Sequence, residues 1–194
     1  MKQVFTLAIA ILTITLLSAQ QNPEGLFINS KAPDFTGKDQ KNEDVRLKDL
    51  LKNGKVVLVF YRGNWCPHCN RYLKKLEDSL QFILDKGAQL VAVTPELPQN
   101  IAKTIEKTNA EYSIIYDKGL KIMKAYDVAF EVSENTLHRY KSTGLDIELM
   151  NGSNGKYLPV PAVYIINQQM DIIFRHFETD YKKRPNVKDI LANL

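Results

Sequence analysis

The chain has 194 residues, of which 44% are hydrophobic and 25% are charged, so a single globular domain with a sizeable core is expected. Its formal net charge of +4 is small and its lysines are scattered, which argues against nucleic-acid binding. Neither an internal repeat nor a low-complexity tract is found, which excludes repeat architectures and long disordered tracts.

The N-terminus has the pattern of a secretory signal peptide. Met1–Gln3 is a short positive start, Val4–Leu17 is apolar, and Leu17-Ser18-Ala19 supplies the small residues of a cleavage site. We therefore expect residues 1–19 to be a signal peptide. The apolar stretch is shorter than the ~20 residues that span a bilayer comfortably, although an uncleaved membrane anchor stays an alternative.

Cleavage after Ala19 would leave residues 20–29 as an N-terminal linker and residues 30–194 as the folded domain. The mature protein is then expected outside the cytoplasm, in the periplasm, where disulfides persist. Contact with the membrane is expected only if the segment is not cleaved.

Strands and helices alternate along the folded part of the chain. Apolar patterns and turn residues predict, in order, a hairpin of 32–35 with 44–47, a brief helix 49–52, strand 56–61, a helix after the two cysteines that ends at 86–87, strand 89–94, helix 99–108, strand 112–116, helix 120–126, an antiparallel pair 162–167 and 172–176, and a last helix 187–194. Such alternation predicts an α/β fold, with a central mixed β-sheet flanked by helices on both faces.

Residues 131–158 form the longest irregular stretch. A helix is expected over 133–140 with Ser133 as its N-cap, followed by a Gly/Asn-rich loop at 151–155. That loop either borders the active site or is a surface excursion, which is the commoner case.

The most informative motif is Cys66-Pro67-His68-Cys69, which holds both cysteines of the chain and follows a strand directly. The free N–H groups and the dipole of a helix N-terminus stabilise a thiolate, the form of cysteine that attacks disulfides and peroxides. Cys66 is placed to be that thiolate, and Pro67 suits the first helical position because its missing N–H has no partner to lose there. Cys69 lies one turn further on and can close a disulfide with Cys66.

Two neighbours are expected to tune this pair. His68 adds a proton-dependent positive charge beside the sulfur, and Trp65 supplies an apolar wall. A structural disulfide is a weaker alternative, because so short a ring restrains little of the unfolded chain. A zinc half-site would need two more ligands, and His138 and His176 stand alone without ligand spacing.

The chain resembles the alkyl hydroperoxide reductase and thiol-specific antioxidant (AhpC/TSA) family, a peroxiredoxin-like branch of the thioredoxin-like superfamily. Four segments carry the resemblance: Ala32–Phe35, Val57–Cys69, Tyr116-Asp117 with Lys124–Val128, and Leu158–Ala162. The resemblance covers the chain from about Ser30 onward. It implies a thioredoxin-like fold with an N-terminal hairpin extension.

The resemblance implies two further assignments. Pro161 matches the cis-proline that lies opposite the cysteines, where the backbone of Val160 would pair with an extended substrate. Asp180-Tyr181 and Arg184 match a recurrent segment of the peroxiredoxin-like branch, for which a structural turn is the expected role.

The peroxidase pattern of the family is incomplete here. Typical peroxiredoxins carry Pro-x-x-x-Thr/Ser-x-x-Cys, and this pattern places Arg62 at the proline, Cys66 at the hydroxyl residue and Cys69 at the peroxidatic position. The hydroxyl that holds the peroxide is thus absent. The family's arginine also has no match, because Val160-Pro161 stands in its region, and losing such donors should slow peroxide reduction.

The sequence therefore predicts an exported thiol-disulfide oxidoreductase in which Cys66 attacks and Cys69 resolves. A thiol-dependent peroxidase, with Cys69 or Cys66 as the peroxidatic cysteine, is the nearest alternative. A copper-binding, metallochaperone-like module that uses both cysteines and a histidine is a further one. Expected partners are protein or small-molecule thiols and disulfides, hydroperoxides under the second hypothesis, and a redox partner that recharges the pair; no cofactor is required.

Overall fold

The computed structural model describes residues 22–194, so the predicted signal peptide lies outside the described residues. The elements, in chain order, are β1 (Thr36–Lys38), β2 (Asp44–Arg46), α1 (Leu47–Leu50), the 3-10 helix η1 (Leu51–Asn53), β3 (Lys55–Phe60), α2 (Pro67–Glu77), α3 (Leu80–Asp85), β4 (Ala88–Thr94), α4 (Pro98–Thr108), β5 (Ser113–Tyr116), α5 (Lys121–Ala125), β6 (Ala129–Glu131), α6 (Glu134–Ser142), α7 (Ile147–Asn151), the 3-10 helix η2 (Gly152–Asn154), β7 (Tyr157–Pro159), β8 (Ala162–Ile166), β9 (Ile172–Phe177) and α8 (Val187–Ala192).

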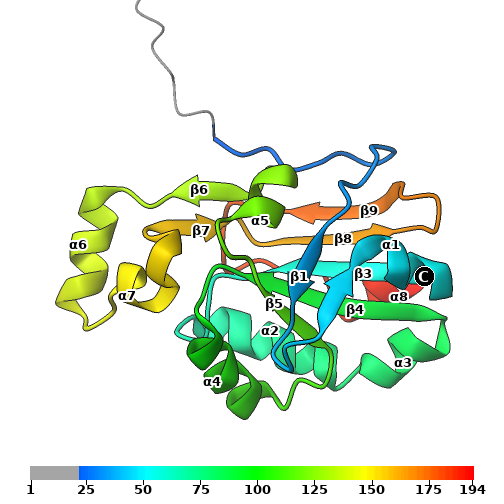
Figure 1. Cartoon of the computed structure of the whole chain (residues 1–194), viewed down its shortest axis with the longest axis horizontal. Helices are drawn as coiled ribbons and strands as arrows, with labels where there is room; N and C mark the ends of the chain where they lie inside the picture. The colour runs from blue at the N-terminus through cyan, green and yellow to red at the C-terminus, as the bar shows by residue number, and fades with distance from the viewer. Residues whose placement is uncertain (1–21) are drawn as a thin grey trace, which may run out of the picture.

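A central five-stranded sheet has the order β5-β4-β3-β8-β9 (Figure 1). Strands β3, β4 and β5 run parallel, whereas β8 and β9 are antiparallel to their neighbours. The predicted mixed sheet is therefore confirmed. Strand β3 occupies its centre because five of its six residues are apolar and fully buried, which is typical of a strand covered on both faces.

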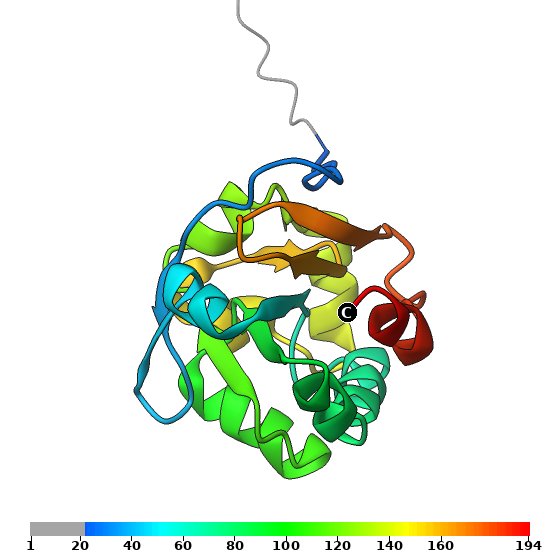
Figure 2. The ribbon, with the colours of Figure 1, turned by 90° about the vertical axis from the view of Figure 1, so that its right-hand side faces the viewer.

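The alternating side chains of the sheet form two separate cores. Leu58 and Phe60 of β3 point into a core that contains side chains of α1, α5 and the β1–β2 hairpin. Val57 and Val59 point into the opposite core, which contains side chains of α2, α3, α4 and α8. The helices therefore cover both faces of the sheet, as Figures 1 and 2 show from two directions.

Residues 129–159 form a lobe at one end of the sheet, at the left of Figure 1. Strands β6 and β7 pair antiparallel, and α6 and α7 connect them. A small core of its own joins these elements, with Val132, Leu137, Ile147 and Leu158 buried at its centre. The helix predicted from Ser133 is confirmed as α6, whereas the short helix α7 and the two strands were not predicted.

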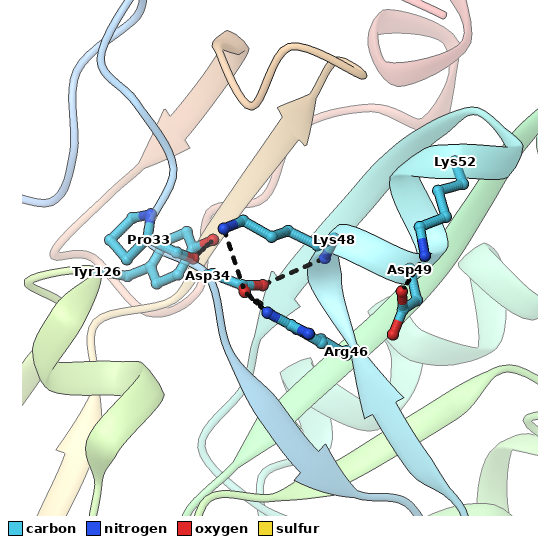
Figure 3. Close-up of polar contacts among 7 residues, drawn as sticks. All are labelled: Pro33, Asp34, Arg46, Lys48, Asp49, Lys52 and Tyr126. Atoms are coloured by element: carbon cyan, nitrogen blue, oxygen red, sulfur yellow. Dashed lines mark hydrogen bonds and ion pairs between the residues drawn. The ribbon is translucent and has the colours of Figure 1, made fainter.

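The N-terminal hairpin is confirmed, but its first strand begins one residue after the predicted 32–35 segment. The carboxylate of Asp34 accepts hydrogen bonds from the Arg46 side chain at 2.9 and 3.1 Å and from the backbone N–H of Lys48 at 3.2 Å (Figure 3). The Tyr126 hydroxyl donates to the carbonyl of Pro33 at 2.9 Å. These contacts hold residues 33–34 against α5 and the start of α1 instead of in a strand pair.

The helix predicted after the cysteines is two helices, α2 and α3. The chain turns at Asp78-Ser79, where the backbone of Ser79 has φ −114° and ψ 5°, outside the helical range. Leu76 and Ile83 are nevertheless buried in the same core, so the continuous apolar periodicity hid the break. No helix within residues 22–194 has the length and apolarity needed to cross a membrane.

Residues 24–26 are hydrogen-bonded to the folded body. The backbone N–H of Gly25 donates to the carbonyl of Asp127 at 3.0 Å, and that of Leu26 donates to the Tyr164 hydroxyl at 3.1 Å. The Arg175 side chain donates to the carbonyl of Leu26 at 2.8 Å. This stretch of the predicted linker therefore lies along α5 and β9.

Candidate active site

The two cysteines lie at the N-terminus of α2. Cys66 is the N-cap residue with an extended backbone, Pro67 is in the first turn, and the backbone N–H of Cys69 points to Cys66 Sγ at 3.4 Å. Pro67 is exposed, whereas both cysteines are 1% exposed and are not joined by a disulfide. Cys66 Sγ thus occupies the position where helix N–H groups stabilise negative charge.

The environment of the two sulfurs drives their pKa values in opposite directions. The Cys69 thiol donates to a Cys66 thiolate, and this hydrogen bond, with the Cys69 backbone N–H and the charges of Arg62 and Arg184, lowers the pKa of Cys66 to about 6 against the opposing effect of burial. Burial, followed by the adjacent Cys66 thiolate, raises the pKa of Cys69 well above its usual value. These opposite shifts make Cys66 the sulfur that is ionised at neutral pH and Cys69 its neutral hydrogen-bond donor.

Arg184 contacts the second sulfur. Its Nη2 lies 3.6 Å from Cys69 Sγ, and its Nη1 donates to the carbonyls of Tyr181 and Lys183, both at 2.6 Å. Arg184 therefore holds the turn between β9 and α8, as expected from the sequence, and also brings a positive charge to the cysteines, which was not expected.

Arg62 is the second arginine whose charge acts on Cys66, and it is 5% exposed. Its guanidinium is 4.9 Å from the ring centroid of Trp65 and 4.4 Å from that of Tyr181, and it donates to the Tyr140 hydroxyl at 2.5 Å. The rings of Trp65 and Tyr140 are 5.7 Å apart. The stacked cation thus joins the cysteine loop to α6 of the lobe and to the 178–186 segment. The part of the lobe that reaches the site is α6, whereas the side chain of Asn154 in the Gly/Asn-rich loop donates to the carbonyls of Pro95 and Asp117.

His68 faces outward from the helix, with its ring 5.8 Å from that of Tyr181 in an edge-to-face arrangement. The cations that lower the pKa of Cys66 are Arg62 and Arg184. These two arginines were not predicted from the sequence to act as charges on the thiols, and the tuning role of His68 stays a prediction.

A buried carboxyl group, Glu96, lies behind the cysteine loop. It is 0% exposed and accepts hydrogen bonds from the backbone N–H of Asn64 at 2.7 Å and from Asn64 Nδ2 at 2.8 Å. Burial raises the pKa of Glu96 to about 7, opposed by these bonds and by the charge of Lys107, and ionisation of Cys69 would raise it further. Glu96 is therefore poised to exchange a proton near neutral pH.

Gly63 allows this carboxylate to approach. Its φ is +153°, and a Cβ at this position would lie 2.5 Å from both Glu96 Oε1 and Trp65 Nε1. Any side chain would displace the carboxylate or the indole.

The prediction of a cis-proline is wrong, because every peptide bond in residues 22–194 is trans, including Val160–Pro161. The Val160 N–H donates to the carbonyl of Val128 at 2.8 Å and continues the β6–β7 pairing, so the chain reaches Pro161 already extended. Only the carbonyl of Val160 is left to pair with a substrate chain. Ala162 faces Phe60 in the sheet, so Val160 and Pro161 do lie at the cysteine end of β3.

Sequence reasoning did not identify Arg62 or Arg184 as charges on the thiols and did not consider Glu96 at all. The available signal for Glu96 was an acidic residue two positions after the buried strand β4, at the edge where the neighbouring β3 ends in the cysteine loop. His138 lies on α6 and His176 on β9. Within residues 22–194, no three His, Cys, Asp or Glu side chains are grouped to hold a metal ion.

A five-stranded mixed sheet with a Cys-x-x-Cys pair at the N-terminus of the helix that follows its central strand defines a thioredoxin-like dithiol protein. The AhpC/TSA family model matches residues 28–175, and the chain belongs to this family.

Curated relatives include proteins of both functional types. The chain is 26% identical over 99 residues to the thiol-disulfide oxidoreductase ResA of Halalkalibacterium halodurans. This match covers 50% of this chain and 55% of that protein. It is 31% identical over 101 residues to the peroxiredoxin Bcp of Bacillus subtilis, covering 52% and 64%. The matches thus span less than two thirds of the length of these relatives.

Solved structures share the fold. Peroxidoxin BcpB from Mycobacterium tuberculosis superposes with a TM-score of 0.66 at 19% identity, over 86% of this chain and 94% of that one. The thioredoxin domain of a thiol-disulfide oxidoreductase from Bacteroides vulgatus gives a TM-score of 0.56 at 18% identity, over 81% and 93%. At these identities the likeness concerns the fold.

Proposed function

We propose that the protein is a thiol-disulfide oxidoreductase in which Cys66 is the attacking and Cys69 the resolving cysteine. The observation that carries this assignment is the opposite environment of the two sulfurs. Cys66 caps a helix and has a pKa lowered to about 6, whereas Cys69 is buried and retains its proton. The names of the ResA relatives support the same reaction type.

In the reductive direction, the Cys66 thiolate attacks one sulfur of a substrate disulfide. The substrate S–S bond breaks, the departing sulfur takes a proton, and a mixed disulfide joins Cys66 to the remaining half. Cys69 then loses its proton, for which the buried Glu96 carboxylate is the proposed acceptor, and attacks Cys66 Sγ, which releases the second substrate thiol and closes the Cys66–Cys69 disulfide. The substrate gains two electrons, and a separate redox partner must return them to the pair.

The same steps in reverse oxidise a substrate dithiol. The arginines favour the thiolate form of Cys66 and hence the reduced protein, which makes its disulfide more oxidising. The charges of the two arginines thus act on the oxidising strength of the disulfide in addition to the effect predicted for His68 within the motif.

A peroxidase is the second candidate, because Arg184 Nη2 lies 3.6 Å from Cys69 Sγ and could hold a developing oxyanion there. The family pattern, however, places the peroxidatic sulfur at Cys69, whose pKa is raised, so that little thiolate would be available. Disulfide exchange at Cys66 fits the two sulfurs better.

Trapping of mixed disulfides tests the assignment. The reduced mature protein and the variants Cys66→Ser and Cys69→Ser are mixed with hydroxyethyl disulfide and analysed by mass spectrometry. We expect Cys69→Ser to accumulate an adduct on Cys66 because its resolving thiol is gone, and Cys66→Ser to form almost none. An adduct chiefly on Cys69 would overturn the proposal.

A peroxide arm separates the two candidates. Trp65 is the only tryptophan of the sequence, directly precedes Cys66 and stacks on Arg62. Its fluorescence in a stopped-flow instrument therefore follows oxidation of the cysteine pair. We expect hydrogen peroxide to oxidise the protein no faster than an ordinary low-pKa thiol, and chiefly at Cys66. Rapid oxidation that survives Cys66→Ser and is lost in Cys69→Ser would instead establish a peroxidase.

We also propose that the protein acts outside the cytoplasm, in the periplasm, after removal of residues 1–19. The supporting feature is the N-terminal pattern of a positive start, an apolar stretch and Leu17-Ser18-Ala19. Cell fractionation followed by N-terminal sequencing tests this proposal. A mature periplasmic protein that begins at Gln20 is expected, whereas an unprocessed cytoplasmic chain would contradict it.

A further inference from the structure

A basic pocket adjoins the cysteine pair, between α2 and the segment that leads into α8. It has a volume of about 220 Å³. Its lining residues are His68, Arg71, Tyr72, Lys75, Lys182, Arg184, Pro185, Asn186 and Val187. The pocket thus combines four cationic side chains and a histidine with no carboxylate in its lining.

The cations of this pocket are not neutralised by ion pairs. Within residues 22–194, none of Arg71, Lys75, Lys182 and Arg184 has an Asp or Glu oxygen within 4.0 Å. Two acidic side chains lie nearby without lining the pocket: Asp180 accepts a hydrogen bond from the backbone N–H of Lys182 at 3.1 Å, and the exposed Asp189 of α8 acts on Tyr72. Because like charges repel, such a cluster favours a bound anion.

Tyr72 provides a second and independent sign of a ligand. It lines the pocket and is 6% exposed, and its hydroxyl is buried without a hydrogen-bond partner among the described residues. Buried polar groups without a partner are rare in folded proteins and cost stability. An acceptor that enters deeply enough to reach this hydroxyl would satisfy it.

The pocket is connected to the reacting sulfurs through one side chain. Arg184 lines the pocket and its Nη2 lies 3.6 Å from Cys69 Sγ. His68 lines it from within the Cys-x-x-Cys motif itself. An anionic group in the pocket would therefore lie next to a disulfide that reacts with Cys66.

We propose that this pocket binds a carboxylate that the substrate carries a few bonds away from its disulfide, so that acidic disulfides are preferred over neutral and cationic ones. The inference rests on the proposed function. Thiols derived from amino acids ordinarily carry carboxylates, and both a small acidic disulfide and an acidic side chain next to a protein disulfide present the same group. The volume suits a short acidic arm rather than a folded segment.

Three small disulfides of similar size test the preference: dithiodipropionate is anionic, hydroxyethyl disulfide is neutral and cystamine is cationic. The reduced protein is mixed with each, and Trp65 fluorescence gives the second-order rate constant. The double variant Arg71→Gln with Lys75→Gln removes two charges from the pocket. Lys74→Gln is the control, because Lys74 lies on the same helix and does not line the pocket.

We expect the double variant to lower the rate with dithiodipropionate by about tenfold, as for the loss of one charge-assisted contact. The rate with hydroxyethyl disulfide should fall less, the rate with cystamine should not fall, and Lys74→Gln should change all three by less than about twofold. Each comparison is between variants on one disulfide, so the intrinsic reactivity of the disulfides cancels.

An equal effect on all three disulfides, or an equal effect of Lys74→Gln on dithiodipropionate, would overturn the carboxylate site. Failure of the wild-type protein to react with any disulfide would instead refute the proposed function. A pair of oxidised peptides, with glutamate or glutamine beside the cystine, distinguishes the sources. A preference for the glutamate peptide over the glutamine peptide that exceeds the preference for dithiodipropionate over hydroxyethyl disulfide would assign the pocket to a protein substrate.

Discussion

Substituting Glu96 with glutamine is expected to change how the stability of the protein depends on pH. Glu96 is fully buried and accepts two hydrogen bonds from Asn64, at 2.7 and 2.8 Å. The amide nitrogen of glutamine cannot accept a hydrogen bond, so one of these contacts is lost. That loss costs about 1 kcal/mol at every pH.

The pH-dependent part has the opposite sign. The pKa of Glu96 is about 7 in the folded protein, against an ordinary value of 4.5. Between these values the folded state holds the proton and the unfolded state does not, so this carboxyl group makes stability fall as pH rises through the window. The difference between 4.5 and about 7, at about 1.4 kcal/mol per pH unit, amounts to about 3 kcal/mol.

Urea denaturation at pH 5 and at pH 8 measures the effect. We expect the free energy of unfolding of Glu96→Gln, measured relative to that of the wild type, to be about 2 to 3 kcal/mol larger at pH 8 than at pH 5. The variant should therefore be the more stable protein at pH 8. Glu106→Gln makes the same chemical change at an exposed position of α4 and serves as the control. A free-energy difference between Glu96→Gln and the wild type that is constant with pH would refute a raised pKa and the proposed role of Glu96 as a proton acceptor.

Three further predictions follow from the geometry of the site. The rate of Cys66 alkylation by iodoacetamide should rise with a midpoint near pH 6, and Arg62→Met should move the midpoint upward because one stabilising charge is lost; an unshifted midpoint would contradict the role of Arg62. Tyr181→Ala should accelerate alkylation of the thiolate several-fold, since the Tyr181 ring packs against Arg62 at 4.4 Å and against His68 at 5.8 Å, and Cys66 itself is only 1% exposed. An unchanged rate would show that Tyr181 does not limit access. Gly63→Ala should lower the free energy of unfolding by about 1 to 3 kcal/mol in urea titrations, because its Cβ would lie 2.5 Å from Glu96 and from Trp65. An unchanged free energy of unfolding would mean that the cysteine loop rearranges at little cost.

Local chemistry allowed much of the fold to be predicted from the sequence. The apolar run of β3, the alternation of strands and helices and the Cys66-Pro67 helix start depend on neighbouring residues, and each was predicted close to its observed position. The predictions failed where distant contacts decide the conformation. Residues 33–34 are held by Arg46 and Tyr126 instead of pairing as a strand, and the N–H of Val160, expected to face a substrate, donates to the carbonyl of Val128.

The sequence by itself determined the reactive group of this protein, because a Cys-x-x-Cys pair after a buried strand places a thiol at a helix N-terminus whatever surrounds it. Only the tertiary structure decided how the two sulfurs differ. Arg62, Glu96 and Arg184 come from the loop after β3, the loop after β4 and the turn before α8, and they act on the cysteines through space and burial. Electrostatic effects depend on distance and on exclusion of water, and neither can be read from sequence separation.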